Sequence, residues 1–399
     1  MRILVLDEEF PYPLNSGKRI RTYNLFQRLA NRHEIGYLAY GHEESDSAQA
    51  LNDVGIRPIA VEPQVPEKSG LRFYLRLLTN IFSSLPYIVD SHYSELFSRK
   101  MTQCIDEFEP DLVMCEWSPY AIFVRGLESV KKVIVAHNIE STIWKRYHET
   151  ETSLLKKWYI VPQARKVDKF ERDAFGWVDG ATAVSADEAA TIGTMAPELP
   201  VEVVDNGVDL EYFTGEKDRE KPGKLVFVGS MDWRPNQDAV GYFVESIAPL
   251  LARDNPSLET TFVGRKPTEE IREYGNLEGI TVTGTVDDVR PYIDEAAVYV
   301  VPLRVGGGSR LKILEALAMG KAVVSTSVGA EGLDLQDGRH LILADEPDSF
   351  SEAVSNLLSD EVRRRQLGEE GRKRVEERYG WDAISNVLEA FLEKLVGQS

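Results

Sequence analysis

Short apolar runs rich in β-branched residues alternate with helical patterns along almost the whole chain, and this alternation restricts the possible folds. Such runs lack a polar face, so each is typical of a strand buried on both sides of a parallel sheet built from βαβ units. The first half has expected strands at residues 3–6, 35–39, 112–115, 133–136 and 181–184. The second half has them at 225–228, 260–263, 281–283, 298–302, 322–325 and 341–343. The pattern predicts an α/β protein with two parallel sheets.

A linker is expected at residues 196–208, where two prolines precede the turn-forming pair Asn206-Gly207. The 399 residues suffice for two domains, which we place at 1–200 and 201–379. The last segment, 381–395, has apolar residues at the spacing of an amphipathic helix. That spacing alone leaves open which domain the helix packs on.

The net charge excludes one class of partner. The formal charge is −19, so the chain has no excess of Lys and Arg to displace the counterions of a nucleic acid. Residues 201–399 contribute −14 of this charge, which makes the second half look unfavourable for an anionic ligand. Two cysteines, an N-terminus without a long apolar segment and no apolar run near 20 residues predict a cytoplasmic protein with reduced thiols.

One strand-to-helix junction in the second half is nevertheless typical of a phosphate site. The strand at 298–302 leads into a glycine run that includes Gly307 and Gly308, and Ser309 is the expected helix N-cap. The helix is expected to end at Gly320. Two cations, Arg310 and Lys312, would fall in the first turn of this helix.

Positive side chains at the positive end of a helix dipole are unfavourable unless an anion is also bound there. Arg310 and Lys312 therefore indicate a bound phosphate, and Glu315 on the same helix could accept hydrogen bonds from a ribose diol. A flexible glycine turn followed by a solvated Arg and Lys is the alternative. The preceding strand, the cap, the two cations and the carboxylate together favour the phosphate site.

Two other junctions are candidates for ligand contact. Gly229 and Ser230 follow the strand at 225–228, where an ordinary strand-to-helix turn explains them almost as well. In the first half, Gly17 would present free N–H groups near the start of a helix, and Lys18 and Arg21 would add positive charge. Those cations are equally typical of a solvated helix face.

At these residues the chain resembles the family-4 glycosyltransferases, which are nucleotide-sugar-dependent enzymes of the GT-B fold. The resemblance rests on Asn206-Gly-Val-Asp, on Phe227-Val-Gly and on the segment from Gly306 to Thr326, and it continues to Tyr379-Gly-Trp381. It implies two Rossmann-like domains with parallel sheets facing a cleft. It further implies a donor site on the second domain, an acceptor site mainly on the first, and a C-terminal helix (380–399) that crosses back to the first domain.

Two departures from the family pattern bear on the donor site. The family usually has two Glu residues separated by seven positions; the second is Glu315, but the first position holds Gly307. The family also often has an Arg and a Lys after the Phe-Val-Gly strand, where this chain has Ser230 and Pro235. We infer that Arg310 and Lys312 supply this missing charge to the donor diphosphate from another side.

The resemblance implies catalytic and binding roles for particular residues. His137, at the carboxyl end of an expected strand, would lie beside the donor sugar. The catalytic candidates are therefore His137, Arg310 and Lys312. The donor-binding candidates are Gly17, Gly229, Ser230, Gly307, Gly308, Ser309 and Glu315, and the acceptor-side candidates are Asn15, Lys18 and Arg21.

The resemblance also implies sugar transfer with retention of anomeric configuration. No carboxylate nucleophile can be named, so we expect front-face attack in which the leaving diphosphate takes the acceptor's proton. No Asp-x-Asp sequence occurs, which predicts a metal-independent site neutralised by Arg, Lys and helix N-termini. No cofactor is expected beyond the donor, a UDP- or GDP-linked sugar.

The expected acceptor is a glycan, a glycolipid or a small molecule. Residues 141–172 combine eight Lys or Arg with five aromatic residues, a composition suited to a peripheral contact with the inner face of a membrane. A solvated helix pair whose aromatic residues face the core is the commoner interpretation. Two other functions stay open: another GT-B sugar-nucleotide enzyme such as an epimerase, and a non-catalytic nucleotide-sugar-binding partner of a transferase.

Overall fold

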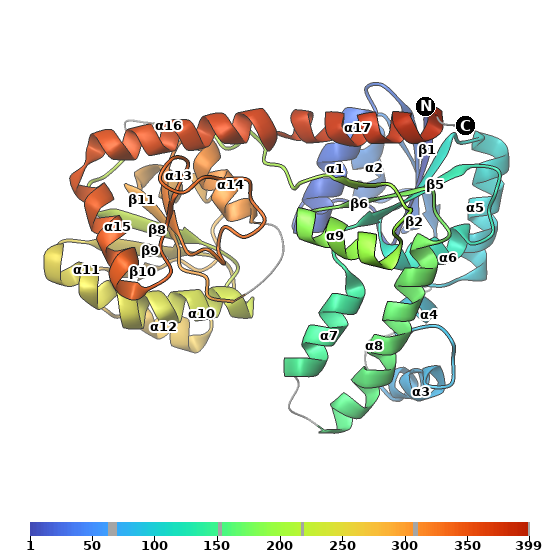
Figure 1. The fold of residues 1–399 in the computed structure, drawn as a ribbon, viewed down its shortest axis with the longest axis horizontal. Helices are drawn as coiled ribbons and strands as arrows, with labels where there is room; N and C mark the ends of the chain where they lie inside the picture. The colour runs from blue at the N-terminus through green and yellow to red at the C-terminus, as the bar shows by residue number, and fades with distance from the viewer. Residues whose placement is uncertain (63–69, 151–153, 217–218, 306–309, 398–399) are drawn as a thin grey trace. The chain divides into compact units, whose positions relative to one another are not determined.

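A computed structural model of the chain describes residues 1–62, 70–150, 154–216, 219–305 and 310–397. The chain divides into two compact units, one formed by Met1–Asp205 with Ile384–Ser399 and the other by Asn206–Ala383. Each unit is an open parallel sheet flanked by helices (Figure 1). The expected class, two Rossmann-like α/β domains with parallel sheets, is confirmed.

The sheet of the first unit has seven strands in the order β3-β2-β1-β4-β5-β6-β7, all paired in parallel. The strands are β1 (Arg2–Asp7), β2 (Glu34–Tyr40), β3 (Ile56–Val61), β4 (Leu112–Cys115), β5 (Lys131–Ala136), β6 (Gly180–Ala183) and β7 (Val201–Val203). The middle strands are buried along nearly their whole length, as their apolar sequences predict.

Ten helices of the described chain belong wholly or mainly to the first unit. They are α1 (Gly17–Leu29), α2 (Asp46–Asp53), α3 (Leu71–Asn80), α4 (Tyr87–Asp90), α5 (Glu95–Phe108), α6 (Ala121–Val124), α7 (Glu140–Thr150), α8 (Leu154–Phe175), α9 (Ala186–Met195) and α17 (Trp381–Gly397). In Figure 1, α7 and α8 extend away from the strands of this unit. No helix in the described ranges is long and apolar enough to cross a membrane.

The sheet of the second unit has six parallel strands in the order β10-β9-β8-β11-β12-β13. They are β8 (Lys224–Val228), β9 (Glu259–Val263), β10 (Ile280–Val282), β11 (Val298–Val301), β12 (Ala322–Ser325) and β13 (Ile342–Leu343). Its helices are α10 (Arg234–Tyr242), α11 (Ala248–Asp254), α12 (Glu269–Tyr274), α13 (Arg290–Glu295), α14 (Leu311–Ala318), α15 (Pro347–Ser359) and α16 (Glu361–Arg378). A π-helical stretch, Phe243–Ile247, joins α10 to α11.

The expected domain boundary after residue 200 falls before β7, which adds an edge strand to the first sheet. The first unit therefore continues to Asp205. The last helix, α17, belongs to the first unit from Ile384 onward. Its packing is close, since a Cβ atom on Gly180 of β6 would lie 2.6 Å from Leu395 Cδ1.

Candidate functional site

In each sheet the strand order reverses at a central strand, β1 in the first unit and β8 in the second. Ligands of open parallel sheets bind beside the carboxyl ends of strands at such a reversal, because the loops diverge there. The loops after β1, β4 and β5 meet at this edge of the first sheet. The loops after β8, β9 and β11 do so in the second.

His137 lies directly after β5 and is held by Glu116, which lies directly after the neighbouring strand β4. The His137 Nε2 and Glu116 Oε2 atoms are 3.1 Å apart, and Thr22 Oγ1 on α1 donates to the same oxygen at 2.8 Å. Burial raises the pKa of Glu116, but the bonds from His137 and Thr22 and the charge of Lys18 outweigh it and leave the pKa below its usual value. Glu116 is therefore an ionised partner for His137.

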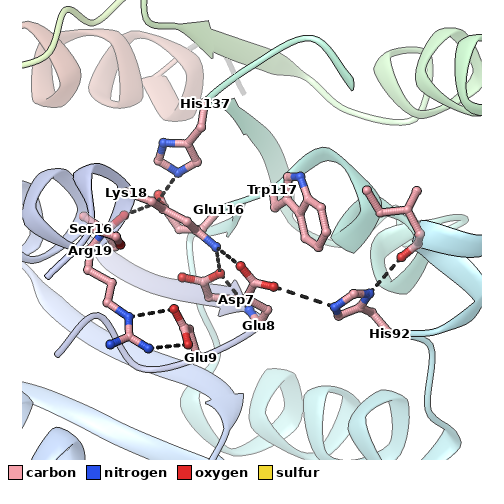
Figure 2. A network of polar contacts seen from close by, with 12 residues as sticks. Asp7, Glu8, Glu9, Ser16, Lys18, Arg19, His92, Glu116, Trp117 and His137 are labelled. Atoms are coloured by element: carbon pink, nitrogen blue, oxygen red, sulfur yellow. Dashed lines mark hydrogen bonds and ion pairs between the residues drawn. The ribbon is translucent and has the colours of Figure 1, made fainter. Parts of the chain in front are cut away.

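A second buried carboxylate, Asp7 at the end of β1, holds Lys18. The Lys18 ammonium donates to Asp7 Oδ1 at 2.6 Å and to Glu8 Oε1 at 3.0 Å, as Figure 2 shows. Tyr37 donates to the other oxygen of Asp7 at 2.6 Å. Burial raises the pKa of Asp7 to about 6 although the charge of Lys18 opposes the shift. Burial also opposes the charge of Lys18, but Asp7 and Glu8 raise the pKa of Lys18 above its usual range.

The other first-unit candidates differ in position. Gly17 is the first residue of α1 and Ser16 is its N-cap, so Gly17 lies close to where the helix was expected to begin. Asn15 is exposed and accepts a hydrogen bond from Arg19 at 3.2 Å. Arg21 is buried, and its guanidinium donates to the carbonyl oxygens of Val204 at 2.7 Å and Asp205 at 2.5 Å. These bonds tie α1 to the chain after β7, and the acceptor-side role of Arg21 stays a prediction.

In the second unit a chain of hydrogen bonds joins two cations at the carboxyl edge of the sheet. Lys312 Nζ donates to Asn236 Oδ1 at 2.6 Å, and Asn236 Nδ2 donates to the main-chain oxygen of Ser230 at 2.8 Å. Arg265, which follows β9, donates to Ser230 Oγ at 2.7 Å. Segments following three different strands thus bring Lys312 and Arg265 to the same edge.

Gly229 has a steric role in this arrangement. A Cβ atom on Gly229 would lie 2.6 Å from Asn236 Nδ2, so only glycine leaves room for that amide. The Gly229 N–H donates to the Val263 carbonyl oxygen at 2.9 Å and therefore extends the pairing of β8 with β9. Its close approach is to the Asn236 side chain, which in turn holds Lys312.

The glycine-run junction differs in one respect from the expectation. Gly307, Gly308 and Ser309 lie outside the described residues, so their predicted contacts stay predictions. Arg310 is the N-cap residue of α14, one position before the first turn in which it was expected. It is buried, and its Nη2 atom lies 3.1 Å from Glu331 Oε2. Gly320, with a φ of 67°, follows the C-cap residue Met319 of this helix, the position at which a glycine was expected.

Lys312 and Glu315 lie one turn apart on α14. Burial lowers the pKa of Lys312 to about 7, although the charge of Glu315 raises it. Burial raises the pKa of Glu315 to about 7, although the charge of Lys312 lowers it. Near neutral pH each group is therefore only partly charged. A nearby anion would favour the ammonium form of Lys312, and hydroxyl donors would favour the carboxylate form of Glu315.

Among the described residues, one group has the composition of a metal site: His33, Glu389 and Glu393. His33 Nε2 already lies 2.7 Å from Glu389 Oε1, and this contact joins the start of β2 to α17. His33 precedes β2 and so lies at the amino ends of the parallel strands, whereas His137 follows β5 and lies at their carboxyl ends. This group therefore holds the last helix and is separate from the candidate site.

Two family models match the chain over most of its length. The model described as "Glycosyltransferase Family 4" matches residues 16–212, and the one described as "Glycosyl transferases group 1" matches residues 222–360. The chain is a GT-B glycosyltransferase. The matched residues include His137 and Lys312, whereas Asp7, Glu8 and Asn15 precede the first matched residue.

The chain is also similar to two proteins in sequence and to a solved structure in fold. The transferase is 23% identical to a 44.6 kDa protein of the cps region of Klebsiella pneumoniae over 369 residues, which are 89% of this chain and 90% of that protein. It is 30% identical to the phosphatidyl-myo-inositol mannosyltransferase of Mycolicibacterium smegmatis over 52% of this chain and 54% of that enzyme. HepE of Anabaena, solved in complex with UDP, has a TM-score of 0.69 and 14% identity, covering 99% of this chain and 100% of that one.

Two residues that were not predicted from the sequence, Glu116 and Arg265, are brought to the candidate sites by the fold of the transferase. Glu116 ends an apolar strand at the same sheet edge as His137, and an acid in that position was the available signal. Arg265 follows Gly264 directly after β9, the neighbour of β8. The sequence gives no signal for Arg265, because it follows β9, whereas the family's usual cations follow the strand that corresponds to β8.

Proposed function

We propose that this glycosyltransferase moves a sugar from a UDP- or GDP-linked donor to a glycan, glycolipid or small-molecule acceptor, with retention of configuration and without a metal ion. The observation that carries the proposal is the bonded chain from Lys312 through Asn236 and Ser230 to Arg265. It directs two cations to the sheet edge where the phosphates of a nucleotide bind in such folds.

The donor diphosphate would be neutralised by Lys312, Arg265 and Arg310. Arg265 replaces the cation that the family usually places at Ser230, since its side chain reaches that serine from the neighbouring strand. A diphosphate that meets several cations needs no divalent ion for its charge. Asp232, the acid bonded to Ser230 at 2.6 Å, lies near Arg265 and Lys266 and is thereby already paired.

Glu315 would accept hydrogen bonds from the ribose hydroxyls. Its carboxyl has a pKa of about 7 because it is buried, so the unliganded protein holds it partly protonated at neutral pH. Two hydroxyl donors favour the ionised form. Ribose binding would therefore ionise Glu315, and a diphosphate would charge Lys312 on the next turn.

His137 would contact the donor sugar, and Glu116 would orient it. An ionised Glu116 accepts the Nε2–H of His137 and leaves Nδ1 as the acceptor of a sugar hydroxyl. In front-face attack the acceptor oxygen bonds to the anomeric carbon while the bond to the leaving phosphate oxygen breaks. That oxygen takes the acceptor's proton, and Lys312, Arg310 and Arg265 stabilise the negative charge that grows on the leaving group.

Two properties of similar proteins support parts of this proposal. HepE is bound to UDP in its structure, which supports a nucleoside diphosphate donor. The relative from Mycolicibacterium smegmatis is a mannosyltransferase of phosphatidyl-myo-inositol, which supports a lipid-linked acceptor. The epimerase and the non-catalytic alternative are not favoured by these matches.

Thermal-shift measurements with UDP, GDP, ADP and their common sugars would test the donor site first. A ligand at one hundred times its Kd stabilises the native state by about 2.7 kcal/mol, which raises the melting temperature of one such unit by several degrees. Nuclear magnetic resonance of the product then gives the anomeric configuration, and EDTA tests metal independence. No shift with any nucleotide would contradict the proposal, and an altered sugar formed without acceptor would indicate an epimerase.

A further inference from the structure

Exposed apolar side chains gather where α3 packs beside α8, away from the strands of the first unit (Figure 1). The exposed fractions are 92% for Phe82, 63% for Trp158, 54% for Leu78 and 51% for Leu75. We call these four residues the α3–α8 face. Contiguous apolar groups of this kind mark interaction surfaces, whereas single exposed apolar residues need no explanation.

The structure holds this face in place through buried polar contacts beneath it. Lys166 Nζ on α8 donates to the carbonyl oxygens of Asn80 at 2.7 Å and Ile81 at 3.0 Å, and so caps the end of α3. Gln163, which is fully buried, donates to the Asn80 side chain at 2.8 Å. Phe82 follows this anchored turn directly, and its N–H bonds back to Thr79 at 3.1 Å. Its exposure is therefore a built feature of the fold.

A shallow groove continues the face along α8. It is lined by Ile81, Lys157, Trp158, Val161 and Pro162. An indole beside an apolar groove, with a lysine at its margin, is the arrangement that lies well in the interface of a bilayer. The apolar rings enter the acyl boundary while the charged ends stay at the headgroups.

The charge of this region is opposite to that of the whole chain. Residues 71–90 and 154–167 contain one acid, Asp90, which accepts a hydrogen bond from Asn80, and six basic residues, Arg72, Arg76, Lys156, Lys157, Arg165 and Lys166, in a chain of formal charge −19. Such a basic region repels its own copy, which disfavours a symmetric dimer through this face. Anionic lipid headgroups complement it.

We propose that the α3–α8 face docks the transferase on an anionic lipid bilayer. The inference deepens the proposed function, on which it rests, because it names the surface that brings the enzyme to a lipid-linked acceptor. The proposed membrane contact differs from the one expected through residues 141–172, because Trp158 is the one face residue that belongs to that segment. Phe170 of that segment is buried in the core, and three of the four face residues come from outside the segment: Leu75 and Leu78 on α3 and Phe82 in the turn after it.

Co-sedimentation of the full chain with vesicles tests the proposal. We expect binding to vesicles of phosphatidylcholine with about one-third phosphatidylglycerol, weak binding to phosphatidylcholine alone, and release by salt. The double variant Phe82→Ser/Trp158→Ser is expected to lose affinity about tenfold or more. The double variant Lys157→Glu/Arg165→Glu is expected to bind anionic vesicles more weakly. Removing each positive charge should lower the affinity about fivefold, and the new negative charges should lower it further.

A matched control uses α16 of the second unit, where Val362 is 80% exposed and Lys373 is exposed. Val362→Ser/Lys373→Glu should bind vesicles as the unchanged chain does. Binding that is indifferent to anionic lipid, or unchanged in the Phe82/Trp158 variant, would overturn the proposal. So would sedimentation equilibrium that shows this variant dissociating a dimer in the absence of vesicles.

Nucleotide thermal shifts on the same variants separate the two proposals. A face variant that loses vesicle binding but keeps the nucleotide shift supports the docking surface and leaves the donor site intact. An unchanged chain that binds anionic vesicles but no nucleotide refutes the proposed function while the docking surface stands.

Discussion

Replacing Glu116 by Gln tests whether this carboxylate positions His137 for transfer. Glu116 is 2% exposed, and both of its described side-chain hydrogen bonds end on one oxygen, from Thr22 at 2.8 Å and from His137 at 3.1 Å. Glutamine has the same shape and keeps one acceptor oxygen for these two donors. The substitution therefore removes the negative charge with little change in packing.

The expected loss of activity follows from the difference between a hydrogen bond to an ionised group and one to a neutral group. Hydrogen bonds to an ionised group contribute about 1.5–3 kcal/mol and neutral ones about 0.5–1.5 kcal/mol, so the bond from His137 weakens by about 1–1.5 kcal/mol. If His137 is positioned only through this bond, kcat falls about tenfold. The donor KM should change little, because Lys312 and Arg265, the cations proposed to bind the diphosphate, lie on the second unit.

Initial-rate kinetics with the donor identified by thermal shift measure both constants. Thr22→Val is the matched control, since it removes the other bond to the same oxygen without touching His137. We expect Thr22→Val to lower the melting temperature slightly and to keep most of kcat. Equal losses of kcat in the two variants, or a normal kcat in Glu116→Gln, would refute a positioning role for Glu116.

Four further predictions concern the donor site and the last helix. Arg310→Ala should raise the donor KM and lower kcat by orders of magnitude, and near-normal kinetics would exclude it from the diphosphate site. Arg265→Ala should raise the donor KM about tenfold, as expected for a lost hydrogen bond to a charged group, whereas Arg272→Ala, an exposed arginine on α12, should not. Donor affinity, measured by calorimetry, should fall up to tenfold per pH unit above about 7. The reason is that Lys312 loses its proton there, whereas diphosphate binding needs the ammonium form. A donor affinity that stays constant between about pH 7 and 9 would contradict this. Phe391→Ala in α17 should cost about 3 kcal/mol of stability by leaving a cavity on the first unit, seen as a fall of several degrees in the melting temperature, and an unchanged melting temperature would show that α17 is not docked there.

Most of the fold could be predicted from hydrophobic pattern. All eleven expected strands are present within a residue or two of their expected positions, because burial on both faces leaves an apolar run that is visible in the sequence. The two unexpected strands, β3 and β7, are the edge strands of the first sheet. β3 contains Pro58, which lacks a donor for a second neighbour and is tolerated only at an edge, and β7 has three residues.

The candidate site was predictable in its location but not in its contacts. The glycine-run junction and His137 could be placed at carboxyl ends of strands, since parallel strands bring those ends to one edge. The contact of Arg21 with the chain after β7 could not be predicted, because the side of α1 on which it lies is set by the packing of that helix near β7. Ser230 stands where the family often has an arginine, so the sequence suggests that a positive charge is missing there. In the fold, Arg265 after β9 lies beside Ser230 and supplies a positive charge at this position.

The sequence by itself determined the two parallel sheets, the amphipathic last helix and the strand ends at which the candidate site residues lie. These properties depend on local burial and on residue types within one strand and the loop after it. Only the tertiary structure decided that Glu116 holds His137 and that Arg265 reaches Ser230. Each of these pairs joins residues far apart in the chain, and distances of a few ångströms between them follow from strand order and helix packing.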